Sequence, residues 1–449
     1  MRFPLKFLKS SEPSAPGVRP VWFWSVRPKS DREAGDAVAS NFLLHWFPAK
    51  VSKASMAWSY SFWLGTATAA LFLLTILSGL PLLLLYVPSV ERAYQSVKDI
   101  EYVVTFGRWL RAVHRISAHA MVIAVVLHLA RVFFTGAYKN GVGRNQHREW
   151  NWVIGMVLLL VTLFLSFTGY LLPWDQLAFW AVTVGTNIAS AVPYVGPSVR
   201  ELLIGGREIG QATLIRFYVM HIVFLPAILG VLFGYHMWRV RKDGGLARAD
   251  SEERLSTPRT IPVTPTKTYT LLGVARGTAP AVTVRTLEAP DATVNAISDL
   301  ARRSLIATLG TIAFISILAV FIGSPLEEPA NAFITPNPAK APWYFMWLQE
   351  IVADTTIHLG YFTINGAFIG GVVLPGALVT WLAVWPWLDK SPKEAAGRWF
   401  APSRRTQNLV FILIVLGVLA LTVTGMWLRG PYWQFYWPWE SWPAVPTRF

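Results

Sequence analysis

The sequence predicts an all-α integral membrane protein in which a four-helix bundle is followed by three further transmembrane helices. The 449-residue chain is 53% hydrophobic and 14% charged, a composition typical of membrane proteins rather than of soluble enzymes. A polar tract rich in threonine and proline separates four apolar segments from three more. Each apolar segment is long enough to cross a bilayer. These segments lie at about 58–87, 112–135, 150–172, 217–238, 303–323, 365–387 and 408–428.

The chain divides into four parts, which are a basic arm at 1–57, a four-helix domain at 58–241, a polar linker at 242–302 and a three-helix domain at 303–449. With seven spans, the arm and the linker lie on the same side of the membrane. Lysine and arginine number 28 in the segments on that side and 10 in those on the other. The positive-inside rule therefore predicts a cytoplasmic N-terminus and linker, and a C-terminus outside.

The net charge of +15 does not indicate nucleic-acid binding. Most of the excess lies on the predicted cytoplasmic side, where topology and attraction to the anionic lipid membrane explain it. Cysteine is absent, which excludes disulfides, thiolate-held iron–sulfur clusters and covalently attached haem within this chain. The predicted function is therefore sought inside the membrane.

Four histidines lie in two of the apolar segments at matched spacing. His114 and His128 are 14 residues apart in the second span, and His221 and His236 are 15 apart in the fourth. Fourteen residues of helix rise about 21 Å, within a hydrocarbon layer roughly 30 Å thick. Both spans run from outside to inside, so His114 is expected to face His221 and His128 to face His236. Imidazoles facing each other across a bundle are axial ligands of haem iron, which predicts two non-covalent b-type haems.

A single membrane histidine is often only part of an interhelical hydrogen bond. A transporter or channel that uses such histidines to carry protons is the alternative from another functional class. The paired spacing favours haem. His119 lies about 140° around the helix from His114 and is expected to pack or hydrogen-bond rather than bind iron.

Glycines and arginines support the haem prediction. Glycines repeat a 14-residue spacing in the first and third spans, where they would leave room for the haem: Gly65 and Gly79, then Gly155 and Gly169. Arginines close to the histidines are expected to pair with the haem propionates, because a guanidinium binds a carboxylate through two hydrogen bonds. These are Arg111, Arg115, Arg131 and Arg216.

The chain resembles the cytochrome b/b6 family, the haem-bearing core of quinol:cytochrome c oxidoreductases. Four motifs carry the resemblance, namely RAVHR…H…R at 111–131, TGYLLPWDQ at 168–176, RFYVMH…H at 216–236 and EPANAFITPNPAKAPWYF at 328–345. The 15-residue spacing and the four-plus-three division are similar to the b6 branch, with both parts fused in one chain.

The resemblance implies a quinol-oxidising pocket outside and a quinone-reducing pocket inside, in a prokaryotic cytoplasmic or other energy-transducing membrane. Electrons would cross through the two haems, with proton translocation. It also implies a Rieske-type iron–sulfur protein, a cytochrome c subunit and a homodimeric multisubunit complex. The outer pocket is expected at Pro173, Trp174, Asp175, Trp343 and Tyr344, and the inner pocket near Arg241, Lys242 and Asp243.

The chain departs from the family at the outer pocket. The family usually carries Pro-Glu-Trp-Tyr, whose glutamate takes a quinol proton, whereas Pro342 stands in place of that acid here. Glu350 is the nearest replacement and would form a row with Asp354 and His358 if 342–358 is helical. Tyr344, Glu350 and Asp175 are thus the residues expected to take part in catalysis. The missing acid also favours an alternative, a di-haem quinone-reactive subunit of another respiratory complex without Rieske-dependent bifurcation.

Overall fold

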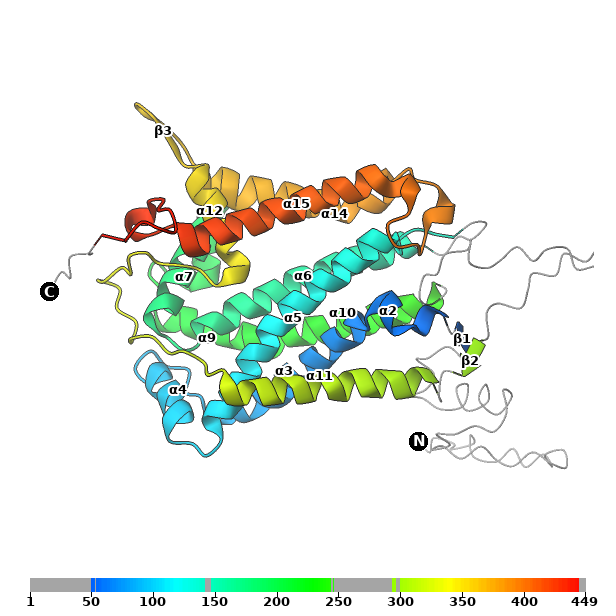
Figure 1. Cartoon of the computed structure of the whole chain (residues 1–449). Coiled ribbons are helices and arrows are strands. Elements are labelled where there is room, and N and C mark those ends of the chain that lie inside the picture. The colour runs from blue at the N-terminus through cyan, green and yellow to red at the C-terminus, as the bar shows by residue number, and fades with distance from the viewer. Residues whose placement is uncertain are drawn as a thin grey trace, which may run out of the picture.

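The computed structural model describes residues 50–52, 54–141, 147–243, 245, 293–295 and 299–443. Most of the predicted basic arm (1–57) and linker (242–302) lies outside these residues. Within the described part, seven helical spans are long and apolar enough to cross a membrane (Figure 1). They are Leu64–Leu85, Gly107–Thr135, Arg148–Leu171, Gln211–Lys242, Ala301–Phe321, Gly366–Leu388 and Pro402–Leu428. The predicted fold class and number of spans are confirmed.

Four spans are single α-helices, namely α3 (Leu64–Leu85), α5 (Gly107–Thr135), α6 (Arg148–Leu171) and α11 (Ala301–Phe321). The other three contain a π-helical turn of five residues. The fourth span consists of α9 (Gln211–Val219), the π-helical η3 (Met220–Phe224) and α10 (Leu225–Lys242). The sixth consists of α13 (Gly366–Phe368), the π-helical η6 (Ile369–Val373) and α14 (Leu374–Leu388). The seventh consists of η8 (Pro402–Arg404), α15 (Arg405–Val423) and the π-helical η9 (Thr424–Leu428). Pro226 and Pro375 follow the first two widened turns. A proline ring clashes with the carbonyl four residues earlier, and here that carbonyl lies in the widened turn.

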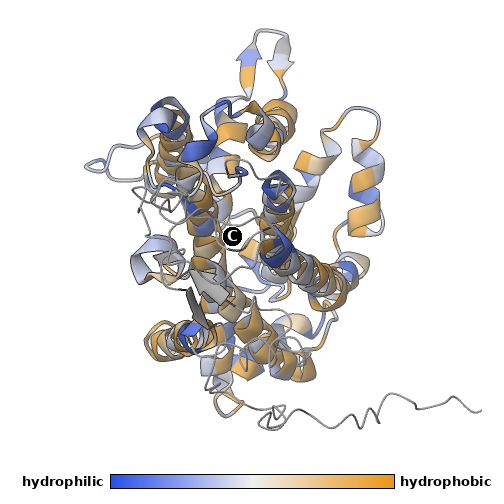
Figure 2. Ribbon diagram, turned by 90° about the vertical axis from the view of Figure 1, so that its right-hand side faces the viewer, coloured by the Kyte–Doolittle hydropathy of each residue, from blue (hydrophilic) through white to orange (hydrophobic). Residues whose placement is uncertain are grey.

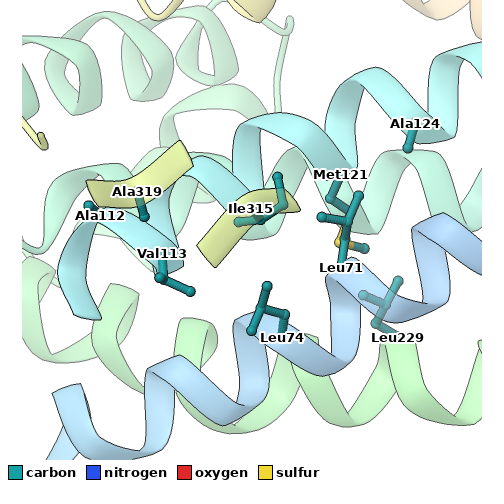
Figure 3. Packing of buried hydrophobic residues seen from close by; sticks show 9 residues of the cluster. All are labelled: Leu71, Leu74, Ala112, Val113, Met121, Ala124, Leu229, Ile315 and Ala319. Carbon is teal, nitrogen blue, oxygen red and sulfur yellow. The ribbon is translucent and has the colours of Figure 1, made fainter. Parts of the chain in front are cut away.

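The helices α3, α5, α6 and α10 form a four-helix bundle, in which α3 packs along α5 and α6 packs along α10. The helix α11 packs against α3 and α5. A buried apolar cluster joins α3, α5, α10 and α11 (Figure 3). Its members are Leu71, Leu74, Ala112, Val113, Met121, Ala124, Leu229, Ile315 and Ala319. The helix α11, the first span of the C-terminal half, is thus packed against the bundle.

The last two spans lie along the other side of the bundle, where α14 contacts α6 and α15 contacts α12. The spans consist mostly of hydrophobic residues, as the ribbon coloured by hydropathy shows (Figure 2), and many large apolar side chains on them are exposed. Leu84 is 84% exposed and Phe321 is 78% exposed. Large apolar side chains left exposed along a long helix are what contact with lipid requires.

Shorter elements lie at the two ends of the spans (Figure 1). We name these ends by the predicted topology. The outer end carries α4 (Ala93–Tyr102), α7 (Gln176–Ser190), α8 (Gly196–Ile204), α12 (Trp343–Asp354), the hairpin β3 (Ile357–Leu359) and β4 (Phe362–Ile364), and η10 (Pro431–Trp433). The inner end carries β1 (Lys50–Ser52) paired antiparallel with β2 (Thr293–Asn295), η2 (Ala54–Met56), α2 (Trp58–Ser61) and η7 (Lys393–Ala395).

The row of Glu350, Asp354 and His358 required a helix over 342–358, and this condition is not met at the C-terminal end. The helix α12 ends at Asp354, and the threonine pair that follows turns the chain into the β3–β4 hairpin. Thr355 is the C-cap of α12, and its hydroxyl donates to the carbonyl of Ile351 at 2.6 Å. His358 therefore lies in the hairpin, 3.0 Å from the Thr363 hydroxyl, and cannot continue a helical row from Glu350.

A buried polar cluster joins the two halves of the chain at the inner end. The hydroxyl of Tyr138, just past α5, donates to Asp389 Oδ2 at 2.7 Å. Arg404 is fully buried, donates to the Tyr138 oxygen at 2.6 Å and lies 3.4 Å from Asp389 Oδ2. Lys139 also lies 3.4 Å from that carboxylate oxygen. Both cations face the carboxylate of Asp389, so the charged groups of the cluster can be buried. The cluster thus holds the α14–α15 connection against the end of α5.

Candidate functional site

The four histidines singled out in the sequence form two facing pairs within the bundle. The ring centroids of His114 and His221 are 6.2 Å apart, and those of His128 and His236 are 6.5 Å apart. The rings are inclined at 74° in the first pair and 78° in the second. The structure therefore brings together the histidines that were paired from sequence spacing.

A widened helical turn explains why the two helices use different spacings. His114 and His128 lie in the uninterrupted helix α5, whereas His221 lies in the π-helical segment η3. In a π-helical turn the backbone hydrogen bonds join residues five apart instead of four, so the turn contains one residue more than an α-helical turn. The additional residue between His221 and His236 is absorbed there, so both pairs remain matched in depth.

Hydrogen bonds fix the proton positions in the outer pair, His114 and His221. Nδ1 of His221 lies 3.1 Å from the carbonyl oxygen of Leu165, which can only accept, so this nitrogen carries the hydrogen. Nδ1 of His114 lies 3.1 Å from the hydroxyl oxygen of Ser78. That hydroxyl donates its hydrogen to the carbonyl oxygen of Leu74, so it accepts from His114 Nδ1. In both neutral rings Nε2 is therefore unprotonated. That is the arrangement of a metal-binding histidine held by a second hydrogen bond.

Each of the four predicted glycines lies against one of these histidine rings. A Cβ atom would lie 3.1 Å from His114 at Gly79, 3.3 Å from His128 at Gly65 and 3.8 Å from His236 at Gly155. At Gly169 it would run into the ring of His221. Gly65, Gly79 and Gly169 thus leave room for the imidazoles, and the expectation that the four glycines also leave room for the haem stays a prediction.

The spacing of each pair fits a metal ion bound between two imidazoles. A ligating nitrogen lies about 2 Å from its metal and roughly 1 Å from its ring centre, so two opposed rings have centroids about 6 Å apart. The described residues contain no group of three or more His, Cys, Asp or Glu side chains that could hold an ion. Two histidines alone suit haem iron, because the porphyrin supplies the other four ligands.

The arginines predicted to bind propionates differ in their surroundings. Arg131, near the inner pair, is 5% exposed, and its Nε and Nη2 have no hydrogen-bond partner. Its guanidinium lies 4.9 Å from the centroid of the Tyr60 ring. A buried guanidinium with unused donors fits an anionic group such as a propionate. The structure shows no hydrogen bond from Arg115 among the described residues, and this half-buried side chain interacts electrostatically with Tyr344.

Two of the predicted arginines have other partners. Arg111 pairs with Glu101 at 2.7 Å and donates to the carbonyls of Ser324 and Pro325 at 2.8 and 2.9 Å. Arg216 is exposed and donates to the carbonyl of Leu202. These contacts hold the outer loops, and the predicted role of Arg111 and Arg216 in binding a propionate stays a prediction.

Trp343 and Tyr344, the first two residues of α12, contact the bundle at the predicted outer pocket. Nε1 of Trp343 donates to Nδ1 of His119 at 2.9 Å. The Tyr344 ring centroid lies 5.6 Å from that of His119. Burial raises the pKa of Tyr344 to about 12, so its hydroxyl keeps its proton at neutral pH.

Asp175 caps the N-terminus of α7 and also binds the segment that precedes α12. Its Oδ1 accepts from the amide of Ala178 at 2.9 Å and its Oδ2 from the amide of Glu327 at 3.3 Å. Next to it, the Trp174 carbonyl accepts from the amide of Ala330 at 3.1 Å, and Pro173 is half-buried. Burial raises the pKa of Asp175, although the two backbone hydrogen bonds oppose the rise. Both carboxylate oxygens thus have structural partners.

Glu350 has different partners from those expected of a quinol base. Its side chain is fully buried and lies 2.7 Å from the guanidinium of Arg429, in the C-terminal tail. The indole of Trp433 donates to its other oxygen at 3.1 Å. Asp354 binds the same guanidinium at 2.8 Å. Both oxygens of Glu350 are therefore occupied by the tail.

The residues predicted for the inner pocket lie at the end of α10, one to two turns beyond His236. Asp243 is buried and pairs with Arg239 at 2.8 Å. Lys242 is exposed, with its amine 4.9 Å from the centroid of the Trp238 ring, and Arg241 is half-buried. Of the three, Asp243 has an opposite charge beside it, Arg239, which was not among the predicted residues.

Two contacts at the outer end were not predicted from the sequence. His119 was expected to pack or hydrogen-bond, but its partner was not predicted, and a polar side chain within a span was the available signal. Arg429 was not among the predicted residues. Glu350 and Arg429 are separated by 79 residues, so no local pattern links them.

Comparisons with known proteins agree with this arrangement. The family described as "Cytochrome b/b6/petB" matches residues 50–244, and "Cytochrome b(C-terminal)/b6/petD" matches residues 329–437. The "Menaquinol:cytochrome c reductase cytochrome b subunit" of Geobacillus thermodenitrificans is 40% identical over 201 residues, covering 44% of this chain and 87% of that protein. "Cytochrome b6" of Synechococcus elongatus is 41% identical over 181 residues, covering 40% and 81%.

A solved structure described as "Hyperthermophilic respiratory Complex III" aligns with a TM-score of 0.61 and 25% identity. The alignment covers 84% of this chain and 86% of that one. Sequence and structure thus agree over both the four-helix part and the three-helix part. The chain belongs to the cytochrome b/b6 family.

Proposed function

We propose that this chain is the cytochrome b subunit of a complex that oxidises quinol at the outer end and delivers electrons to a quinone at the inner end. The observation that carries the proposal is the two facing histidine pairs, with a glycine against each ring. The names of the similar proteins support the same activity, because one relative is a menaquinol:cytochrome c reductase subunit.

In this proposal His114 and His221 hold an outer haem, and His128 and His236 hold an inner one. When bound, a b-type haem accepts and releases single electrons. The glycines of α3 and α6 let the imidazoles reach their positions, and Arg131 offers unused donors to a propionate. The histidines of one helix are separated by about 21 Å in depth, so the two sites together span most of the hydrocarbon layer.

Trp343 and Tyr344, with Pro173 and Trp174, line the proposed quinol site at the outer end. Tyr344 keeps its hydroxyl proton, and its side chain also has a hydrogen-bond interaction with Ser166 of α6. Arg241, Lys242 and Asp243 border the proposed quinone site at the inner end. Protons released outside and taken up inside give net proton translocation.

The chain has no cysteine, so the iron–sulfur partner of the reaction has to be another subunit. We therefore include a Rieske-type protein, a cytochrome c subunit and a homodimeric assembly in the proposal. The proposal also places the N-terminus in the cytoplasm, which the distribution of lysine and arginine supports.

A second candidate is a di-haem quinone-reactive subunit of another respiratory complex, without Rieske-dependent bifurcation. Pro342 favours it, because the acid that the family uses is absent, and Glu350 is bound to Arg429. The two candidates differ in their partners and in their reaction. The test is to purify the native complex, identify its subunits by mass spectrometry and measure quinol-dependent cytochrome c reduction. A Rieske-type subunit with inhibitor-sensitive reduction supports the first candidate, and its absence supports the second.

A further inference from the structure

His119 lies between the bundle and the start of α12, at the proposed quinol site, and its role is not explained by haem binding. Its Nδ1 accepts the hydrogen bond from Trp343 Nε1 at 2.9 Å. Its ring centroid lies 6.5 Å from that of Trp343, with the rings stacked, and 5.6 Å from that of Tyr344. The side chain is half-buried, so it remains accessible to a small molecule.

The contact with Trp343 determines where the hydrogen of His119 is. An indole nitrogen can only donate, so Nδ1 of His119 has to be the acceptor. A neutral imidazole has one donor and one acceptor, which leaves the hydrogen on Nε2. Among the described residues, the structure shows no other hydrogen bond from this side chain. His119 therefore presents one N–H donor of fixed position.

We propose that His119 Nε2–H donates a hydrogen bond to a ring oxygen of the quinol or quinone at the outer site, with Trp343 holding the imidazole in the required tautomer. This inference rests on the proposed function. The two acids expected to act there have both oxygens occupied, Glu350 by Arg429 and Trp433 and Asp175 by backbone amides. His119 is beside the two aromatic residues of the site, and its donor is unused.

A fixed donor at a quinol oxygen has two effects. It orients the ring, and it stabilises the negative charge that develops on the oxygen as the hydroxyl proton leaves. His119 is a binding residue in this account and not the proton acceptor, because its Nδ1 lone pair is already used by Trp343. The effect should therefore appear first in the affinity for quinol.

The test compares His119→Gln with His119→Leu and His119→Met in the complete complex. A glutamine oxygen can accept from Trp343 while its amide donates, so Gln retains both hydrogen bonds, whereas Leu and Met retain neither. With menadiol as donor and cytochrome c as acceptor, Leu and Met should raise KM about tenfold, the worth of one hydrogen bond. Gln should stay close to wild type, and all three should keep the wild-type haem spectrum.

His358→Leu is the matched control, because His358 is an exposed histidine at the same end of the molecule. It should change neither KM nor the haem spectrum. An unchanged KM in the Leu or Met variant, or an equal rise in the Gln variant, would overturn the role of His119. A wild-type complex that does not oxidise menadiol or any other quinol would instead contradict the proposed function. The two failures are thus distinguishable.

Discussion

The carboxylate of Glu350 lies 2.7 Å from the guanidinium of Arg429, which follows it by 79 residues. The pair joins α12, at the proposed quinol site, to the C-terminal tail. Trp433 adds a second bond from the tail to the same carboxylate at 3.1 Å. The resemblance implies an acid at the position of Pro342, and Glu350, the nearest acid along the chain, anchors the tail.

Glu350→Gln therefore tests whether this acid anchors the tail or accepts a proton. Removing one charge of a buried pair costs on the order of 3 kcal/mol, so we expect a lower thermal midpoint of the purified complex. Quinol turnover, normalised to haem, should fall by less than about tenfold. A fall of about 10²-fold or more with unchanged thermal stability would instead identify Glu350 as the proton acceptor. Glu394→Gln, at an exposed site of the inner end, is the control.

Asp389→Asn tests the cluster that joins the two halves at the inner end. The change removes the negative charge that faces Arg404, Lys139 and the Tyr138 hydroxyl. It should lower the free energy of unfolding by about 3 kcal/mol at neutral pH, because two buried cations lose their partner. Thermal unfolding in detergent measures the loss, with Glu394→Gln again as control. Equal midpoints would show that the cluster does not hold the halves together.

The same variant should differ from wild type in its response to acid. Burial raises the pKa of Asp389, but hydrogen bonds from Ser391 and Tyr138 and the charge of Lys139 outweigh it, and the net pKa is lowered. A lowered folded-state pKa gives stability that is present above the ordinary value of about 4 and is lost as the pH falls further. The difference between wild type and Asp389→Asn should shrink below that pH. A difference that grows in acid would contradict the lowered pKa.

Gly169→Ala and Gly155→Ala form a matched pair of tests of the histidine sites. A Cβ at Gly169 would run into the ring of His221, whereas one at Gly155 would lie 3.8 Å from His236, at ordinary contact distance. We expect Gly169→Ala to lose most of the outer haem and Gly155→Ala to keep both. Haem content and the reduced-minus-oxidised spectrum of each variant report the outcome. Equal haem loss in both variants would show that close approach is not the reason for these glycines.

Introduced cysteines test the orientation, since the chain has none of its own. Tyr361 is fully exposed in the outer hairpin, and Glu394 is exposed at the opposite end of α14. In intact cells a membrane-impermeant maleimide should label Tyr361→Cys and should not label Glu394→Cys until the membrane is permeabilised. The reverse pattern would place the N-terminus outside and exchange the two proposed quinone sites.

Features that repeat along a helix could be predicted from the sequence. The seven spans, the two histidine pairs and the glycines against them all depend on composition or on spacing within one element, and a helix converts such spacing directly into position. The spacing of 15 residues in the fourth span was visible, but the π-helical turn at His221 was not. A local widening depends on the proline that follows it and on packing between helices.

Contacts between distant segments could not be predicted in this way. Glu350 with Arg429, Tyr138 with Asp389 and His119 with Trp343 join side chains that are 79, 251 and 224 residues apart. Their pairing is decided by how the helices pack, not by any local pattern. For the same reason the contacts of Arg111 and Arg216 with carboxylate and carbonyl groups of the outer loops could not be predicted from the sequence.

Haem content of the purified chain, compared with that of His128→Ala, tests the central claim most directly. The two histidine pairs share no ligand, and hydrocarbon supplies no water to replace a lost imidazole. The account predicts two b-type haems in the wild-type chain. It predicts one in the variant, with the haem at His114 and His221 still reducible. Two haems retained in His128→Ala, or none in the wild-type chain, would contradict it.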